Sequence, residues 1–111
     1  MPKYLVQGSY TDQGLKGLQK EGGSKRRVMV EKLAEAMGGK LEVFYYAFGS
    51  DDFVIILDLP SNIDMAATAI VAQASGMVKS RVTVLMAPEE VDQAVQRKST
   101  SAHRPRPGTT R

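Results

Sequence analysis

The stretch from Leu41 to Leu59, LEVFYYAFGSDDFVIILDL, constrains the fold more than any other part of the chain. It holds two runs that are rich in β-branched and aromatic residues, which favour strands. The four residues between the runs, Gly49 to Asp52, suit a tight turn, because glycine accepts positive φ and aspartate bonds to nearby turn backbone. The stretch therefore predicts an antiparallel β-hairpin.

Neither face of this hairpin is clearly polar. Strand side chains alternate between the two faces of a sheet, so each face takes every second residue. In the first run the two faces are Leu41, Val43, Tyr45 and Ala47 against Glu42, Phe44, Tyr46 and Phe48. An antiparallel sheet in a small monomer usually leaves one polar face in water. We therefore expect something to cover both faces.

The rest of the chain predicts a ferredoxin-like arrangement around the hairpin. Apolar residues recur at alternate positions in some segments and at helical spacing in others. The other predicted elements are a strand at Lys3–Tyr10, a short helical turn around Leu15 and Leu18, helices at Lys25–Met37 and Ile63–Ser75, a strand at Met77–Met86 and a short helix from Pro88. The main elements thus follow the order βαββαβ. This order predicts an α+β fold with a four-stranded antiparallel sheet and the helices on one face.

Several local signals support these boundaries. Thr11, Ser24 and Asn62 can each cap the start of a helix with a side-chain oxygen. Gly22 and Gly23 interrupt the first helical segment. Gly8 inside the first strand predicts a bulge or the close approach of another group.

The apolar character of both sheet faces predicts self-association. A ferredoxin-like monomer leaves one sheet face bare, and here that face would expose more than the few hundred Å² of contiguous apolar surface that soluble monomers tolerate. We therefore expect a homodimer or a higher homo-oligomer in which sheet packs on sheet, a dimeric α/β barrel. The edge strands would be shielded by the partner or by the last helix.

Charge divides the 111 residues into a domain and a tail. The net charge is +3, but five of the fifteen basic residues lie from Arg97 onward, where no acid occurs, which leaves ten basic against twelve acidic residues before them. We expect one mildly acidic domain at residues 1–97 and a disordered basic tail at residues 98–111. Such a tail would bind nucleic acid at most weakly and in a salt-sensitive way.

Composition also excludes some classes of chemistry. The chain has no cysteine, so disulfides and thiol catalysis are excluded. No apolar run approaches the roughly 20 residues of a membrane span, and no secretory signal is recognisable, so we expect a cytoplasmic protein without membrane contact. No cofactor is predicted, and Gly8, Gly14 and Gly49 do not have the spacing of a phosphate-binding loop.

The strongest candidate site combines polar residues of the first and last strands with a tyrosine. If these two strands are neighbours, their side chains converge on or beside the sheet. The predicted ligand-binding residues are Gln7, Ser9, Tyr45, Tyr46, Lys79 and Arg81. A lysine or arginine would bind an anionic group while a tyrosine donates a hydrogen bond. The alternative is that Lys79 and Arg81 lie on a solvated edge strand and protect it from aggregation.

Other polar residues carry weaker hypotheses. His103 is the only histidine and lies in the predicted tail, where nothing would hold it in place for catalysis. Asp51 and Asp52 could share a metal ion or a proton, but hydrogen bonding within the turn is the favoured interpretation, and no metal site is predicted. Arg26 and Arg27 could bind an anion at a helix start, although a solvated surface is favoured there.

Several motifs in this order resemble the GYD-domain family. They are Thr11, Asp12 and Gly14 after the first strand, then YYAFGSDDFV, Pro60, the pair Ser75 and Gly76, and LMAPEE, and they cover about residues 3 to 96. The resemblance implies a ferredoxin-like protein of the dimeric α/β-barrel type from the bacterial cytoplasm, in a family that is largely uncharacterised. At the turn that gives the family its name, Asp51 stands where tyrosine is usual.

Two functional hypotheses follow. The first is an oligomeric α/β-barrel module that binds a small anionic or aromatic metabolite between its sheets. The alternative is a small cofactor-independent enzyme, of the oxygenase or isomerase type, that uses Tyr45 or Tyr46 with Arg81. This alternative rests on analogy of fold.

Overall fold

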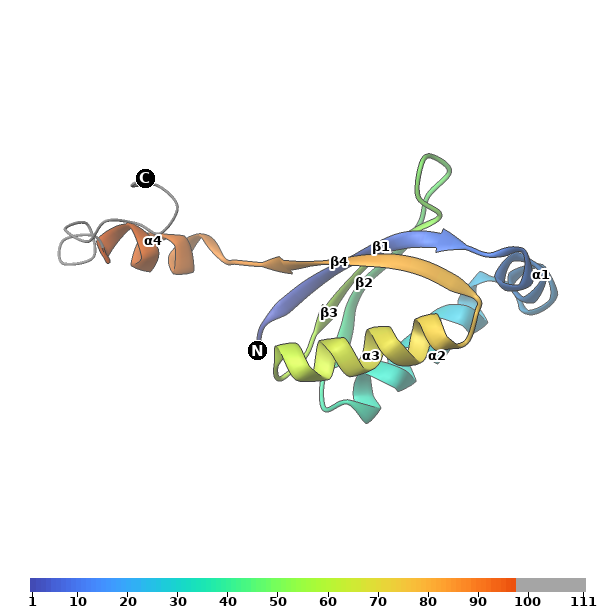
Figure 1. Cartoon of the computed structure of the whole chain (residues 1–111), viewed down its shortest axis with the longest axis horizontal. Helices are drawn as coiled ribbons and strands as arrows, with labels where there is room; N and C mark the ends of the chain where they lie inside the picture. The colour runs from blue at the N-terminus through green and yellow to red at the C-terminus, as the bar shows by residue number, and fades with distance from the viewer. Residues whose placement is uncertain (98–111) are drawn as a thin grey trace, which may run out of the picture.

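A computed structural model describes residues 1–97, and the predicted tail, residues 98–111, lies outside the described residues (Figure 1). The elements are β1 (Lys3–Tyr10), α1 (Asp12–Glu21), α2 (Gly23–Ala36), β2 (Lys40–Tyr46), β3 (Phe53–Asp58), α3 (Asn62–Ala74), β4 (Val78–Leu85) and α4 (Pro88–Gln96). The four strands form one antiparallel sheet in the order β2-β3-β1-β4. The predicted ferredoxin-like fold is confirmed. None of the helices in residues 1–97 is long and apolar enough to span a membrane.

The start of the helical region follows the sequence signals in part. Thr11 caps α1 as predicted, since its side-chain oxygen accepts from the Gly14 N–H at 3.2 Å. The break between α1 and α2 is also confirmed, and Gly22 adopts φ 87°, which favours glycine. The predicted cap at Ser24 is wrong, because α2 already begins at Gly23 and no side chain caps it.

The cap of α3 lies one residue earlier than predicted. Ser61 is the N-cap, and its hydroxyl accepts from the Asp64 N–H at 3.3 Å. Asn62 instead accepts a hydrogen bond of 2.6 Å from the hydroxyl of Tyr4, which ties α3 to β1. The asparagine therefore serves tertiary packing rather than the start of the helix.

A β-bulge in β2 changes which residues share a face. The register shifts between Leu41, which pairs with Leu57, and Val43, which pairs with Ile56. Leu41 therefore packs with the helix-side core, as Phe44 does, and not on the face of Val43. Simple alternation predicted the opposite and was wrong for Leu41, because a bulge adds one residue to a strand.

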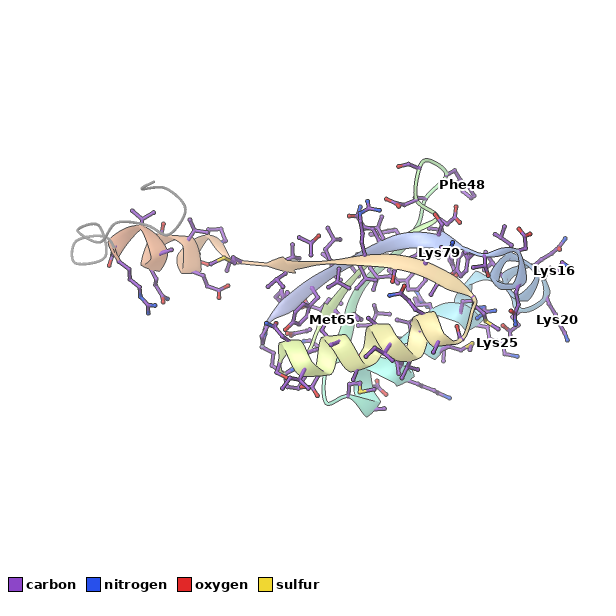
Figure 2. The ribbon with its side chains drawn as sticks, in the orientation of Figure 1. Lys16, Lys20, Lys25, Phe48, Met65 and Lys79 are labelled. Carbon is purple, nitrogen blue, oxygen red and sulfur yellow. The ribbon has the colours of Figure 1, made fainter. Side chains whose placement is uncertain are left out.

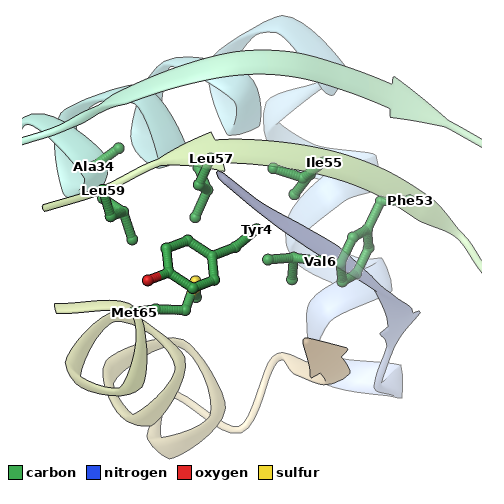
Figure 3. Close-up of a cluster of buried hydrophobic side chains, with 8 residues drawn as sticks. All are labelled: Tyr4, Val6, Ala34, Phe53, Ile55, Leu57, Leu59 and Met65. Atoms are coloured by element: carbon green, nitrogen blue, oxygen red, sulfur yellow. The ribbon is translucent and has the colours of Figure 1, made fainter. Parts of the chain in front are cut away.

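The core lies between the sheet and helices α2 and α3 (Figure 3). Its buried members are Tyr4, Val6, Ala34, Phe53, Ile55, Leu57, Leu59 and Met65. The close approach predicted at Gly8 is confirmed, since a side chain there would clash with the backbone of Lys79 and Ser80 on β4. Neighbouring strands β1 and β4 thus meet without a side chain between them.

The opposite, helix-free face of the sheet is mixed in character. Register pairs place Val43, Ile56, Leu5 and Thr83 in one row across the four strands. Two residues from Leu5 along β1, on the same face, Lys3 pairs with both Glu42 and Asp58. The packing of this face on a second sheet stays a prediction. The last helix does not shield an edge strand, as was one expectation, because α4 lies beyond the end of β4 with all its residues exposed (Figure 1).

Candidate functional site

The predicted site residues of β1 and β4 are neighbours, as the fold requires. Gln7 lies opposite Arg81 and Ser9 lies opposite Lys79 on the helix-free face. Tyr45 lies on the same face, but on β2 at the far edge of the sheet, and 69% of its surface is exposed. These five predicted residues therefore spread over the whole width of one face.

Tyr46 belongs to the other side of the sheet. It pairs with the buried Phe53, and its hydroxyl donates a hydrogen bond of 3.0 Å to the carbonyl of Gly23 at the start of α2. Tyr46 and Arg81 are thus separated by the sheet itself. An arrangement that uses this tyrosine together with Arg81 has no common space in residues 1–97.

Arg81 already has a partner in its own chain. Its two terminal nitrogens donate to the two carboxylate oxygens of Asp51, each at 2.9 Å. These hydrogen bonds from Arg81 hold the pKa of Asp51 below its usual range. The residue at the unusual position of the turn therefore fastens the β2–β3 loop to the edge strand β4. Ligand binding by the predicted set stays a prediction.

A cavity of about 240 Å³ lies on the helix side, between the sheet and helices α2 and α3. Its walls are mostly aliphatic and aromatic side chains. The lining residues are Val6, Tyr10, Arg26, Met29, Val30, Leu33, Phe44, Phe53, Ile55, Leu57, Met65, Thr68, Val71, Ala72, Ser75, Met77 and Val78. This volume is below the roughly 300–1,000 Å³ of sites for drug-sized ligands, so the cavity suits a small molecule.

Arg26 is the charged residue in the wall of this cavity. It is 8% exposed, and its Nη1 contacts the sulfur of Met77 at 3.4 Å. Its Nε lies 3.2 Å from a carboxylate oxygen of Glu21, close enough for an ion pair, but the N–H direction gives this nitrogen no hydrogen bond. A buried guanidinium normally has its donors satisfied. The donors of Arg26 are satisfied only in part.

The position of the Arg26 guanidinium depends on a glycine in α1. A side chain at Gly17 would clash with the Nη2 atom of Arg26. The run of basic residues around Arg26 favoured a solvated surface for this side chain, and that prediction was wrong. The signal that could have located it is the small residue on the neighbouring helix, but only the packing of α1 on α2 shows that the two residues meet.

Tyr10 lies between this cavity and a second pocket of about 410 Å³. The second pocket is also lined by Leu15, Leu18, Tyr46 and Phe48, and Tyr10 is the residue that lines both spaces. Burial, followed by the hydrogen bond with Tyr46, raises the pKa of the Tyr10 hydroxyl well above its ordinary value. The phenol therefore stays protonated at neutral pH and can act as a hydrogen-bond donor. The sequence pattern predicted Tyr10 only as part of a strand, so this residue was not among the predicted site residues.

Asp52 holds the backbone of β1 around Tyr10 in place. Its carboxylate accepts from the Tyr10 N–H at 2.9 Å, while its own N–H donates to the Gly8 carbonyl at 2.7 Å. The predicted hydrogen bonding by aspartate in the turn region is thus confirmed for this residue. Within residues 1–97 no group of three or more His, Cys, Asp or Glu side chains could hold a metal ion.

Comparison with known families gives a match that covers most of the chain. The model of the GYD domain matches residues 4–95, which begin within β1 and end within α4. The chain belongs to the GYD domain family. In this GYD domain the match spans both the cavity and the ion pair between Asp51 and Arg81. Neither the curated proteins nor the solved structures compared with the chain contain a match.

Proposed function

We propose that this GYD domain is a small-molecule-binding module that takes an organic carboxylate into the cavity between its sheet and helices α2 and α3. The observation that carries the proposal is the guanidinium of Arg26, which is nearly buried beside an apolar space and keeps a donor without a hydrogen bond. A carboxylate would accept from two arginine donors at once. The apolar walls would enclose the hydrocarbon or aromatic part of the ligand.

This location differs from the one favoured by the sequence, which lies between two sheets. On the helix-free face Arg81 already holds the carboxylate of Asp51 in two hydrogen bonds. A ligand there would have to displace that partner, whereas a ligand in the cavity would add acceptors to Arg26. The helix-side cavity is therefore the better-supported site.

The enzymatic alternative has less support. A cofactor-independent oxygenase or isomerase needs a group that takes a proton from the substrate. The raised pKa of Tyr10 makes this phenol a poor base at neutral pH, although it could still orient a ligand by donating a hydrogen bond. Binding without turnover is the function that these groups support best.

The test is a calorimetric titration with two pairs of probes, benzoate against benzamide and octanoate against octanamide. The neutral amide of each pair has nearly the same shape, so the difference reports the contact with Arg26. We expect the wild type to bind at least one carboxylate about tenfold more tightly than its amide. Native mass spectrometry of freshly purified protein would show any carboxylate retained from the cell.

Variants connect this preference to one side chain. Arg26→Met keeps the length of the side chain and should remove the preference, whereas Arg26→Lys keeps the charge and should retain part of it. Arg27→Met, one residue further along α2, is the matched control because Arg27 is exposed and should leave binding unchanged. Equal binding of acids and amides by the wild type, or an unchanged preference in a folded Arg26→Met variant, would disprove the proposal.

A further inference from the structure

Helix α4 and the strand before it expose a continuous series of apolar side chains. Val82 and Val84 of β4 point to the helix side, opposite Val6 and Tyr4, yet they stay exposed because β4 is an edge strand. Met86 follows, and α4 then presents Val91 and Val95 one helical turn apart, 47% and 64% exposed. A soluble chain rarely leaves such a series in water without a partner surface.

The charge of α4 has its complement at the other end of the molecule. The nine residues of α4 include three acids and no base, whereas residues 12–27, on α1 and the start of α2, include five basic and two acidic residues. Lys16, Lys20 and Lys25 lie at the end of the molecule opposite α4 (Figures 1 and 2). Among residues 1–97, none of the ion pairs involves these lysines or the acids of α4.

The basic end lies directly beside the start of β4. The Thr11 N–H, at the start of α1, donates to the Met77 carbonyl at 2.9 Å. The side chain of Gln13 lies close to Gly76. Because residues three and seven positions apart share a helix face, Lys16 and Lys20 lie on the same side of α1 as Gln13. Lys16 and Lys20 therefore face the space beyond the N-terminal end of β4.

The acidic helix cannot reach this basic end within one copy. The eight residues of β4 span about 26 Å at the rise of a strand. Two linking residues and the nine residues of α4, folded back, reach only about 20 Å. The complementary charges at the two ends of β4 can therefore meet only between two molecules.

We propose that α4 docks on a second copy of this chain, with the β4 edges of the two copies paired antiparallel about a twofold axis. The antiparallel arrangement brings the α4 of each copy to the α1 of the other, so that both contacts form at once. Pairing centred near Val82 sets Arg81 against Thr83 and Lys79 against Leu85 of the other strand, so that no two like charges lie directly opposite each other. It also closes the exposed edge of β4 and covers Val82 and Val84.

Charge reversal tests the proposal in the full chain. Glu89→Lys with Asp92→Lys makes α4 basic, and Lys16→Glu with Lys20→Glu makes α1 acidic. We expect each double variant alone to weaken self-association about tenfold or more in sedimentation or light scattering. An equimolar mixture of the two should form a heterodimer in native mass spectrometry, because each α4 then meets an oppositely charged α1.

The matched control reverses two acids on another helix, Glu31→Lys with Glu35→Lys on α2, and should leave self-association unchanged. Circular dichroism establishes that each variant is folded. A wild type that stays monomeric at micromolar concentration would overturn the proposal. So would a dimer that survives both reversals, or a mixture that forms no heterodimer, since docking within one copy or through the helix-free face predicts those results.

Discussion

The two sides of the sheet hold arginines in opposite situations. Arg81 lies on the helix-free face with its side chain 62% exposed, and the carboxylate of Asp51 binds two of its nitrogens. Arg26 lies on the helix side, nearly buried, with a single ion-pair contact to Glu21 and a nitrogen that lacks a hydrogen bond. Arg81 lies largely in bulk water, whereas the guanidinium of Arg26 is largely removed from it. An added acceptor therefore stabilises the buried arginine far more.

The same contrast separates residues that are adjacent in sequence. In β3, Ile55 faces the helices and is buried, whereas Ile56 faces away from them and is half-buried. In β2, Tyr46 faces the helices and Tyr45 does not. Substitutions in such pairs therefore compare the two sides of the sheet with identical side chains.

The largest expected effect is on the free energy of unfolding of Ile55→Ala. Ile55 is 6% exposed within the core, so its truncation should cost about 2–5 kcal/mol by urea denaturation. Ile56→Ala should cost only about 1 kcal/mol, because part of that side chain is already in water.

The outcome for Ile56 also bears on how the subunits associate. Equal destabilisation by the two variants, together with a loss of oligomer in Ile56→Ala, would mean that the helix-free face is covered by a second sheet. That result would favour the dimeric barrel expected from the sequence over pairing through β4.

A smaller effect is expected from removing a hydroxyl. Tyr46→Phe loses the hydrogen bond to the Gly23 carbonyl and should lower the free energy of unfolding by about 1 kcal/mol. Tyr45→Phe removes the same group from an exposed side chain and should cause no measurable change. A loss of stability in Tyr45→Phe would indicate that another molecule covers this tyrosine.

The smallest effect on stability concerns Asp51 and Arg81. Because the pKa of Asp51 is lower in the folded chain than in the unfolded chain, the pair stabilises the fold at neutral pH, and this contribution is lost as pH falls through the lowered folded pKa. An NMR titration of the Asp51 carboxyl should give a midpoint below the ordinary value of about 3.9. In Arg81→Gln the midpoint should return toward that value; an unchanged midpoint would contradict the assigned cause.

Much of the fold could be predicted because it depends on local patterns. Alternation in Lys3–Tyr10 and in the hairpin runs, helical spacing in α2 and α3, and the glycine break before α2 are all readable in order along the chain. The errors occur where a contact with another element decides the outcome. One is the pairing of β2 with β3, where a bulge places Leu41 on the helix side. The other is the hydrogen bond from the Tyr4 hydroxyl to the side-chain oxygen of Asn62.

The residues of the candidate site also fall into those whose positions the sequence predicted and those whose positions it did not. That Gln7, Ser9, Lys79 and Arg81 lie side by side follows from strand order, and the sequence was sufficient for it. The burial of Arg26 was not predictable, since a run of three basic residues at a helix start is usually solvated. Gly17 on the preceding helix, α1, leaves the room that the guanidinium occupies, and this depends on how α1 packs on α2.

By itself, the sequence determined the order of the elements, the sheet and the surplus of apolar side chains, because periodicity and turn residues act over a few positions. Only the tertiary structure decided where that surplus and the opposite charges lie. Neighbours in space come from elements far apart in the chain, and the exposed valines of β4 and α4 became visible only once the edge of the sheet was known.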